Sequence, residues 1–600
     1  MIRRLKMVTF LAMLAAFAAT AGAYKVGFEA WPPTGRFHDG RTAMFPTTNL
    51  HFCVKQRALT FLLDRDGALN WQACRTYFAR YHALDAFDLR FSAVLAFGAV
   101  GLLALLGFAL CVRVERPSFK IVRGLRLHTG ASGLNSLRRA CARECKVHGR
   151  GLELLPHVAL SRDRETRHFL ILGSVGGGKT QTMLNLMDEP LARGDGLLVL
   201  DTKGDMTAGL PASPEPLLIA PHDKRSLVWD VAADCCVKQD ARELAARFIP
   251  PSTDPMWSQA AQEIFVACIV HLQVTKGKQW GWPDLEVSVN ADIESLTRYA
   301  RDHNPAAVRL LLQPDSKTTH SILTTFQTHM RIVSVLAEAW PDHRARRFSI
   351  RRWLHHLTPH CPLILQHDPG YPELSRVWIG SMLGLLASAV GSPTLSESSE
   401  RRIWLFLDEF PQLPAIKRFP TFLELGRSKG IAVVIGAQDT SQIRAVYGPD
   451  QTKAWFGMTG TKIITRINAS EAAEDISRMI GDQEVERRIR SDTRSGGRVS
   501  TTESVQRELR RVITASELGS HLGPTKRGVR VLLLGVGDAA YELDLPYIKL
   551  PTLREPILSA DWTHMSPEPR PATNANDNPR AIPSVGLSKD LADRIRQIRP

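Results

Sequence analysis

The residues whose spacing points most clearly to chemistry form one eight-residue stretch, Gly173-Ser174-Val175-Gly176-Gly177-Gly178-Lys179-Thr180. It matches the pattern G-x-x-x-x-G-K-[ST] of a phosphate-binding loop and follows an apolar run, residues 168–172, that is typical of a buried parallel strand. In such a loop the glycines let backbone N–H groups converge on phosphate oxygens, Lys179 adds positive charge and the Thr180 hydroxyl ligates Mg²⁺. The stretch predicts an ATP·Mg²⁺ site that leads into a helix over about 179–193.

A second strand-like run, residues 403–407, ends in the paired acids Asp408 and Glu409. In P-loop enzymes the first acid of such a pair holds the water shell of the metal, and the next one polarises the attacking water. We therefore expect Asp408 to act with Thr180 on the metal, and Glu409 to act in catalysis.

Two more apolar runs deliver polar residues to a strand end. Residues 196–200 run into Asp201–Asp205, and residues 431–437, which follow an expected helix over about 419–429, run into Gln438. Open parallel sheets bind ligands at the carboxyl ends of their strands. Gln438 is expected to sense the γ-phosphate; the alternative is a polar cap between a strand and a loop.

These runs indicate an α/β fold, with residues 161–210 and 400–550 in one P-loop domain interrupted by about 190 residues of mainly helical pattern. Residues 254–258 precede a helix that extends to about 273, and further helical stretches punctuated by proline follow over 293–339. We assign residues 161–250 and 348–558 to the two parts of the nucleotide-binding domain, and residues 251–347 to an inserted all-α subdomain.

Composition sets the class of partner. The 600 residues allow about four domains, and 44% hydrophobic with 23% charged residues excludes a disordered or fibrous chain. Lys and Arg outnumber Asp and Glu by 76 to 60, a net charge of +16 that favours polyanionic partners or an acidic membrane face. Nine cysteines are too few for a disulfide scaffold, and none has the spacing of a structural zinc site.

Two apolar runs precede the P-loop domain. The 22 residues of 91–112 carry no charge and predict a transmembrane helix. The 18 residues of 7–24 follow three basic residues, so residues 1–24 are interpreted as a first transmembrane anchor, with a cleavable signal peptide as the alternative. In both cases residues 25–90 form a periplasmic loop, and the chain from residue 113 onward lies in the cytoplasm.

The flanks of these runs agree with that topology. Residues 113–150 contain ten Lys and Arg against two acids, so residues 113–160 are interpreted as a basic cytoplasmic linker. The periplasmic loop carries nine Lys and Arg, which a loop of this length tolerates. It also contains Cys53 and Cys74, and an oxidising periplasm permits either a disulfide between them or two free thiols.

Two C-terminal segments have unusual composition. Residues 487–511 hold eight arginines against three acids around Ser495-Gly496-Gly497, and are interpreted as a mobile basic loop that either tracks DNA phosphates or is a solvated surface run. Residues 559–600 are interpreted as a disordered Pro-rich tail. A short amphipathic helix after Ser588 either docks on a partner or frays.

Taken in order, these motifs make the chain resemble the TraD/TraG type of conjugative coupling proteins, inner-membrane ATPases of type IV secretion and conjugation systems. The resemblance covers nearly the full length. It is carried by the two apolar runs, the phosphate-binding loop, Asp201–Asp205 and the segments 254–258, 348–354, 405–410, 424–427 and 436–439. Thr202 stands where the family usually has a proline, so the resemblance does not predict the shape of that loop.

The resemblance implies a RecA-like P-loop NTPase that is preceded by two transmembrane helices, assembles as a homo-hexamer at the inner membrane and hydrolyses ATP in the cytoplasm. It implies single-stranded DNA with its relaxosome and relaxase, and the components of the secretion channel, as partners. It also implies that Arg427 is a finger supplied to the neighbouring subunit, where a guanidinium would offset charge on the transferring phosphoryl group. An ordinary arginine at a helix C-terminus is the alternative.

Other functions fit the sequence less well. A translocase of the FtsK kind would bring more membrane helices and a long linker, and an ABC exporter would carry a Leu-Ser-Gly-Gly-Gln signature, which does not occur. A docking platform that binds nucleotide but hydrolyses little has no reason to keep Glu409. The interpretation that fits best is an ATPase that recruits DNA and drives or licenses its transfer.

Overall fold

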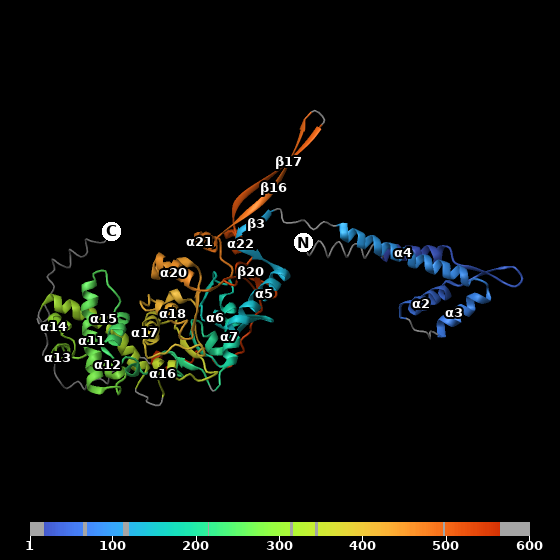
Figure 1. Ribbon diagram of the computed structural model, residues 1–600. Coiled ribbons are helices and arrows are strands. Elements are labelled where there is room, and N and C mark those ends of the chain that lie inside the picture. Colours follow the sequence, from blue (N-terminus) through green and yellow to red (C-terminus); the bar gives the residue numbers. More distant parts are fainter. Residues whose placement is uncertain are drawn as a thin grey trace, which may run out of the picture. The chain divides into compact units, whose positions relative to one another are not determined.

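The structure of the chain is a computed structural model that describes residues 17–63, 69–111, 119–213, 215–311, 316–341, 346–495 and 498–564 (Figure 1). It divides into two compact units, Met1–Phe119 and Lys120–Pro600. The expected N-terminal anchor lies partly, and the helix after Ser588 wholly, outside the described residues.

The first unit is a small helical domain with its own core. Its elements are η1 (Lys25–Ala30), β1 (Thr34–Arg36), β2 (Thr42–Met44), α2 (Thr47–Leu63), α3 (Leu69–Arg80) and α4 (Leu84–Cys111). Cys53 on α2 and Cys74 on α3 form a disulfide, which decides between the two alternatives left open by the sequence. Phe28, Phe78 and Phe87 pack around it with no exposed surface.

The apolar run 91–112 lies almost entirely in α4, a single helix of 28 residues. Among the described residues, one helix has the length and apolar composition needed to cross a membrane, namely α17 (Pro372–Gly391) of the second unit. Its most apolar window is 78% buried inside that unit, so α17 is a core helix. The two transmembrane spans therefore stay predictions.

The second unit is built on a mixed sheet of eleven strands among the described residues. The order is β4 (Arg126–His128), β20 (Ala539–Leu545), β19 (Val529–Leu534), β15 (Thr461–Ile464), β7 (Phe169–Leu172), β14 (Ile431–Ala437), β13 (Ile403–Leu407), β8 (Gly196–Asp201), β12 (Leu363–Gln366) and β9 (Leu217–Ile219), with β18 (Gly523–Pro524) beside β19. From β15 to β9 every neighbouring pair is parallel.

The sheet confirms the α/β fold and its expected strands, and it adds to them. The strands β9 and β12 come from the stretch interpreted as mainly helical, and β15, β19 and β20 extend the sheet beyond β7.

His168, which was expected at the start of this strand, lies just before β7. It is buried, has a φ of 63°, and its Nδ1 accepts a hydrogen bond from Val433 N. Burial lowers the pKa of His168 to about 4, so the ring is neutral.

The helices of the second unit are of two kinds: some lie near the sheet, and others form a separate helical group. Those near the sheet include α5 (Gly130–His148), α6 (Arg162–Glu165), α7 (Lys179–Arg193), α8 (Asp205–Gly209), α16 (Ile350–His355), α18 (Pro420–Leu425), α19 (Thr440–Tyr447), α20 (Pro449–Met458), α21 (Glu471–Ile480) and α22 (Ala515–Ser520), with the turns η3 (Phe410–Gln412) and η4 (Asp561–Thr563). The helix expected over 419–429 is shorter than predicted, because α18 ends at Leu425 and a turn follows.

The helical group lies at one end of the second unit (Figure 1). It contains α11 (Pro255–Lys276), α12 (Trp282–Val289), α13 (Ile293–His303), α14 (Pro305–Leu311) and α15 (Lys317–Ala339). It adjoins α9 (Val231–Asp234), α10 (Lys238–Phe248), α17 and the strand pair β10 (Val228–Trp229) and β11 (Arg347–Phe348). Four buried tryptophans contact one another in tilted or edge-on pairs and tie this group to α17. They are Trp229, Trp282, Trp340 and Trp378, at successive centroid distances of 5.4, 5.7 and 5.8 Å.

The interpretation of residues 487–511 as a mobile loop is wrong. They lie in a long antiparallel hairpin, β16 (Asp482–Ser495) and β17 (Arg498–Arg511), which projects from the body of the unit (Figure 1). The strand β3 (Phe119–Gly124) pairs with β16, and β5 (Arg150–Leu155) pairs with β6 (Val158–Ser161) elsewhere. The β16–β17 hairpin forms because fourteen successive backbone pairs hold its two strands together, although their sequence has no continuous apolar face.

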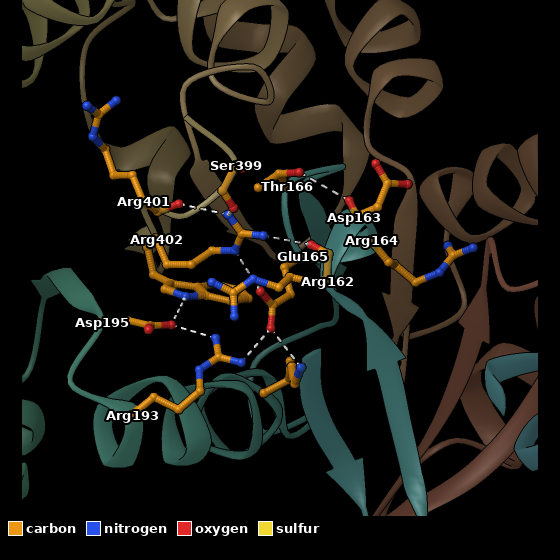
Figure 2. Close-up of polar contacts among 12 residues, drawn as sticks. Arg162, Asp163, Arg164, Glu165, Thr166, Arg193, Asp195, Ser399, Arg401 and Arg402 are labelled. Carbon is orange, nitrogen blue, oxygen red and sulfur yellow. Dashed lines mark hydrogen bonds and ion pairs between the residues drawn. The ribbon is translucent and has the colours of Figure 1, made fainter. Parts of the chain in front are cut away.

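A buried carboxylate joins several elements at the amino edge of the parallel strands. Glu165 has no exposed surface and accepts bonds from Leu152 N at 2.7 Å, Arg193 Nη1 at 2.7 Å and Arg402 Nε at 3.0 Å (Figure 2). Arg193 also contacts Asp195, and Trp404 Nε1 donates to the same Asp195 carboxylate at 2.9 Å. The cluster connects the end of α7 with the starts of β8 and β13.

Glu165→Gln tests that connection. It keeps the shape of the side chain but leaves Arg402, which is buried, without its counter-charge, so we expect a loss of about 3 kcal/mol in the free energy of unfolding. Urea denaturation of a fragment starting at Lys120 measures it. Glu400→Gln is the control, because the Glu400 side chain is 88% exposed and pairs with Arg162 at 3.6 Å, so its loss should stay within about 0.5 kcal/mol. Equal losses in both variants would contradict a structural role for the cluster.

Candidate nucleotide-binding site

The expected phosphate-binding loop lies between β7 and α7, as its sequence pattern predicted. Two of its glycines, Gly176 at a φ of 67° and Gly178 at a φ of 103°, adopt left-handed backbone conformations that side chains disfavour. Gly173 is needed for a different reason: a Cβ there would lie 1.8 Å from Thr465 Oγ1. The loop is therefore packed tightly against the end of β15.

Lys179 is held inside this loop. The side chain is 6% exposed, and its Nζ donates to Gly173 O at 2.8 Å. Burial lowers the pKa of Lys179, while the nearby carboxylates of Asp408 and Glu409 raise it in part. The ammonium is thus a desolvated donor at the place where the pattern puts phosphate.

Thr180 and Asp408, which are 228 residues apart, are in direct contact: Thr180 Oγ1 donates to Asp408 Oδ2 at 3.1 Å. Burial raises the pKa of Asp408, and the charge of Lys179 opposes that shift. A hydroxyl and a carboxylate side by side supply the hard oxygen donors that Mg²⁺ prefers, so this pair fits the metal of a nucleotide site.

Glu409 follows Asp408 with a strained backbone. Its φ of 52° is in the left-handed region, which is uncommon outside glycine and is found often at functional sites. Its carboxylate accepts a bond from Gln412 Nε2. The two neighbouring acids thus have different partners, Thr180 for Asp408 and Gln412 for Glu409.

Gln438 directly follows β14, the strand that lies between β7 and β13 in the sheet. This order sets Gln438 between the loop that contains Lys179 and the acids after β13. Its backbone N–H is fixed by Gln442 Oε1 at 3.3 Å. Of the predicted site residues, Gly173–Thr180, Asp408, Glu409 and Gln438 come to one edge of the sheet.

Arg427 does not join them within this chain. Its Nη2 bonds Asp163 Oδ1 at 2.9 Å, and the side chain is 55% exposed in a cavity of about 770 Å³ that Glu400 and Glu424 also line. Asp163 precedes β7, whereas the phosphate-binding loop follows it, so Arg427 lies at the opposite edge of the sheet. A role in the nucleotide site requires the Arg427 of another subunit.

The structure adds residues that the sequence reasoning missed. The backbone carbonyl oxygen of Arg466 accepts a hydrogen bond from Ser174 N at 2.8 Å. The Arg466 side chain donates from Nη2 to Gly176 O at 3.2 Å. Asn468 N donates to Ser174 Oγ at 2.9 Å. The available signal was weak, because the strand at 461–464 is short and only two of its four residues, Ile463 and Ile464, are apolar.

The loop after β8, which contains Thr202, is held by hydrogen bonds to one buried carboxylate. The buried Asp201 carboxylate accepts bonds from the backbone N–H groups of Lys203, Gly204 and Thr207 and from the Thr207 hydroxyl, at 2.7 to 3.1 Å. Four donors fix the turn, so Thr202 is compatible with an ordered loop. The Asp201 carboxylate is occupied within the loop.

Comparison with known proteins gives the family. Residues 153–539 match the family described as the type IV secretion-system coupling protein DNA-binding domain. The chain belongs to this family. The matched segment contains the phosphate-binding loop, the helical group, both acids, Gln438 and the β16–β17 hairpin.

Relatives in the coupling-protein family are distant. The coupling protein TraD of Escherichia coli (strain K12) is 24% identical over 367 residues, which cover 59% of this chain and 50% of TraD. The conjugal transfer protein TraG of Rhizobium radiobacter is 30% identical over 142 residues, 24% of this chain and 21% of TraG. The chain thus matches half or less of the length of each of these relatives.

Solved coupling proteins share the fold. An unbound bacterial conjugative coupling protein, TrwBdeltaN70, superposes with a TM-score of 0.61 at 22% identity, covering 74% of this chain and 98% of that chain. The plasmid coupling protein TrwB, solved with ADP and Mg²⁺, gives 0.61 at 22% identity, with 74% and 99% covered. The α/β architecture of this coupling-family chain is therefore shared with TrwB.

Gly173→Ala tests the tight packing of the loop in this family member. The added methyl group overlaps Thr465 Oγ1, so we expect a loss of roughly 2 kcal/mol in stability from overpacking, together with weaker nucleotide binding. The double variant Gly173→Ala/Thr465→Ala removes the overlapping oxygen and should recover part of both losses. Calorimetric unfolding and fluorescent-nucleotide titration measure them. Additive losses in the double variant would show that the two residues do not interact as described.

Proposed function

We propose that this chain is an inner-membrane ATPase that recruits a DNA substrate with its relaxosome and drives or licenses its transfer through a type IV secretion channel. The observation that carries the proposal is the contact of Thr180 with Asp408 beside the buried Lys179, in a chain that belongs to the coupling-protein family. TrwB, which shares the fold, has been solved with ADP and Mg²⁺ and with nucleotide analogues.

In the proposed mechanism each residue has one task. The backbone of the Gly173–Gly178 loop and the Lys179 ammonium bind the β- and γ-phosphates of ATP. Thr180 and Asp408 would hold Mg²⁺, which when bound draws charge from the phosphate oxygens. Glu409 accepts the proton of the attacking water, and Gln438, between the two acids and the loop, contacts the γ-phosphate.

Burial determines how strongly these groups act. A desolvated Lys179 binds phosphate more strongly than an exposed lysine would, because its charge is not screened by water. The raised pKa of Asp408 has the opposite consequence: as the pH falls toward that pKa, protonation removes the negative charge that holds the metal. Metal-dependent nucleotide binding should therefore weaken on acidification.

Membrane anchoring is the second part of the proposal. By its sequence, the charge-free run 91–112 is long enough to span a bilayer, and the basic residues that follow favour the cytoplasm for the second unit. With the N-terminal run as a first span, the protein would be a multi-pass inner-membrane protein. A ring of six subunits would supply Arg427 in trans and surround the DNA.

Glu409→Gln tests the chemistry. We expect at least a hundredfold slower DNA-stimulated ATP hydrolysis with nucleotide binding retained, since the loss of a general base typically costs 10²- to 10⁴-fold, about 3 to 5 kcal/mol. Lys179→Ala should lose binding as well. Both variants should insert into the membrane yet abolish transfer in a mating assay. Glu424→Gln, a carboxylate in the cavity at the opposite edge, is the control and should hydrolyse ATP normally.

The salt dependence and the mutant phenotypes separate the candidate functions. Stimulation by single-stranded DNA that fades with added salt supports a DNA-dependent motor, because phosphate contacts weaken as salt rises. Transfer at the wild-type frequency by Glu409→Gln would overturn the motor. ATP binding without DNA-responsive turnover in an assembled ring would favour the docking platform instead.

Arg427 is tested by mixing subunits. Arg427→Ala and Glu409→Gln should each be nearly inactive alone, with Arg427→Ala reduced by about 10³-fold if the guanidinium acts on the phosphoryl group. Mixed rings should regain turnover, because some interfaces then pair an intact arginine with an intact carboxylate. Arg418→Ala, on the same connecting segment and paired with Glu243 at 2.8 Å, is the control. Normal turnover by Arg427→Ala would leave only its ion pair with Asp163.

A further inference from the structure

The turn between α18 and β14, which contains Arg427, has a fixed backbone. The first residue of β14 donates from its N–H to Gly426 O at 2.8 Å. Gly430, at a φ of 72°, lies so close to the segment before β13 that a Cβ there would be 2.1 Å from Arg401 O. Lys429 is 7% exposed, and its Nζ donates to two carbonyls at the end of α17, at 2.6 and 2.8 Å. The backbone of Arg427 therefore has little freedom to move.

The Arg427 side chain, in contrast, is long and 55% exposed. An arginine in this setting samples many rotamers unless a partner holds it. Its Nη2 donates to Asp163 Oδ1 at 2.9 Å. A guanidinium has five N–H donors in a planar fork, so it can donate to a further group while it stays bound to Asp163. With the backbone fixed, the ion pair with Asp163 sets the direction of the guanidinium.

Asp163 is itself firmly placed. It lies on α6, whose Glu165 is anchored in the buried cluster described above, and Thr166 Oγ1 donates to its backbone carbonyl at 3.1 Å (Figure 2). Its second carboxylate oxygen accepts a bond from Arg167 Nε at 2.8 Å. Partial burial opposes ionisation, but the bonds to Arg427 and Arg167 outweigh it and lower the pKa of Asp163. The group is therefore a fixed carboxylate at neutral pH.

Other acids in the same cavity compete for the guanidinium. Three further carboxylates line it, those of Glu397, Glu400 and Glu424. An Arg427 released from Asp163 can pair with any of them that it reaches, and each pairing points the guanidinium in a different direction. The geometry of the Asp163 pair thus selects one orientation among several that the charges alone would allow.

We propose that Asp163 is a positioning residue that holds Arg427 in the orientation in which it enters the nucleotide site of the neighbouring subunit. The inference rests on the proposed supply of Arg427 in trans. Asp163 precedes β7 and the phosphate-binding loop follows it, so Asp163 acts through Arg427 and not on the nucleotide of its own subunit. Orientation matters because a misplacement of about 1 Å can cost roughly 10²-fold in rate.

Asp163→Asn tests the inference in the full chain, with ATP hydrolysis stimulated by single-stranded DNA. Asparagine keeps the shape of the side chain but loses its charge, so we expect kcat to fall about tenfold. The KM for ATP should stay unchanged, because the lost interaction acts in the transition state. Asp163→Glu restores the charge and should recover part of the loss. Arg167→Gln is the control: it removes the other partner of Asp163 and should hydrolyse ATP normally.

Mixing subunits separates positioning from a general structural role. Asp163 and Arg427 act from the same subunit, so a mixture of Asp163→Asn with Glu409→Gln should turn over faster than the average of the two variants alone. Some interfaces then join an intact arginine to an intact site. A mixture of Asp163→Asn with Arg427→Ala should show no such gain, because none of its interfaces receives a correctly held arginine.

Each other outcome overturns a defined part of the argument. A normal kcat in Asp163→Asn, with slow turnover in Arg427→Ala, leaves the trans arginine standing and makes the positioning inference alone wrong. Normal turnover in Arg427→Ala removes the trans arginine itself. Faster turnover in Asp163→Asn would mean that Asp163 restrains Arg427. Slow turnover without a gain on mixing with Glu409→Gln would assign Asp163 to the folding of α6.

Discussion

Strand order is the constraint on which the site depends. Because β14 lies between β7 and β13, and all three are parallel, the ends of segments that begin at residues 169, 403 and 431 meet at one edge. Thr180 can touch Asp408 only in this arrangement. At the other edge, Glu165 joins the end of α7 to the starts of β8 and β13. The helix α7 and the strand β13 are thus connected to each other at both edges of the sheet.

The buried charges at the two edges of the sheet differ in how completely they are neutralised by neighbouring groups. The Glu165 carboxylate is fully paired with two arginines and a backbone donor, so its burial is compensated within the protein. At the nucleotide edge compensation is incomplete: burial lowers the pKa of Lys179 and raises that of Asp408, each against the charge of the other. Phosphate and metal would supply the missing counter-charges. Buried charges that lack full counter-charges in the free protein, and gain them from a ligand, favour strong binding of that ligand.

The sequence allowed prediction wherever an apolar strand ends in a polar motif. This rule located Lys179, Asp408 and Gln438, because a buried parallel strand has a distinctive composition and its carboxyl end has a fixed place in the sheet. It did not locate Arg466, whose strand is short and follows no known motif. The hairpin at 482–511 was missed because charged residues occur on both of its faces, so neither face has the apolar alternation from which strands are recognised.

Contacts that span long sequence separations could not be predicted from patterns at all. The pairing of Arg427 with Asp163 and of Arg402 with Glu165 depends on the segments before β7, β13 and β14, whose course local sequence does not specify. The same holds for Cys53 and Cys74, for which composition allowed both states. In each case the deciding quantity is the distance between two backbone positions in the folded chain, and only the assembled fold supplies it.

The segment after Glu409 shows how the site and the helical group share contacts. Arg247 on α10 donates to Ala415 O, Arg418 pairs with Glu243 on the same helix, and Ile416 N donates to the Tyr447 hydroxyl at 3.2 Å. Two of these contacts come from α10, which packs on both α11 and α17, so the segment after Glu409 is held partly by a helix that adjoins the helical group. The segment that follows Glu409 thus connects the nucleotide-binding edge of the sheet to α10 through two side-chain contacts.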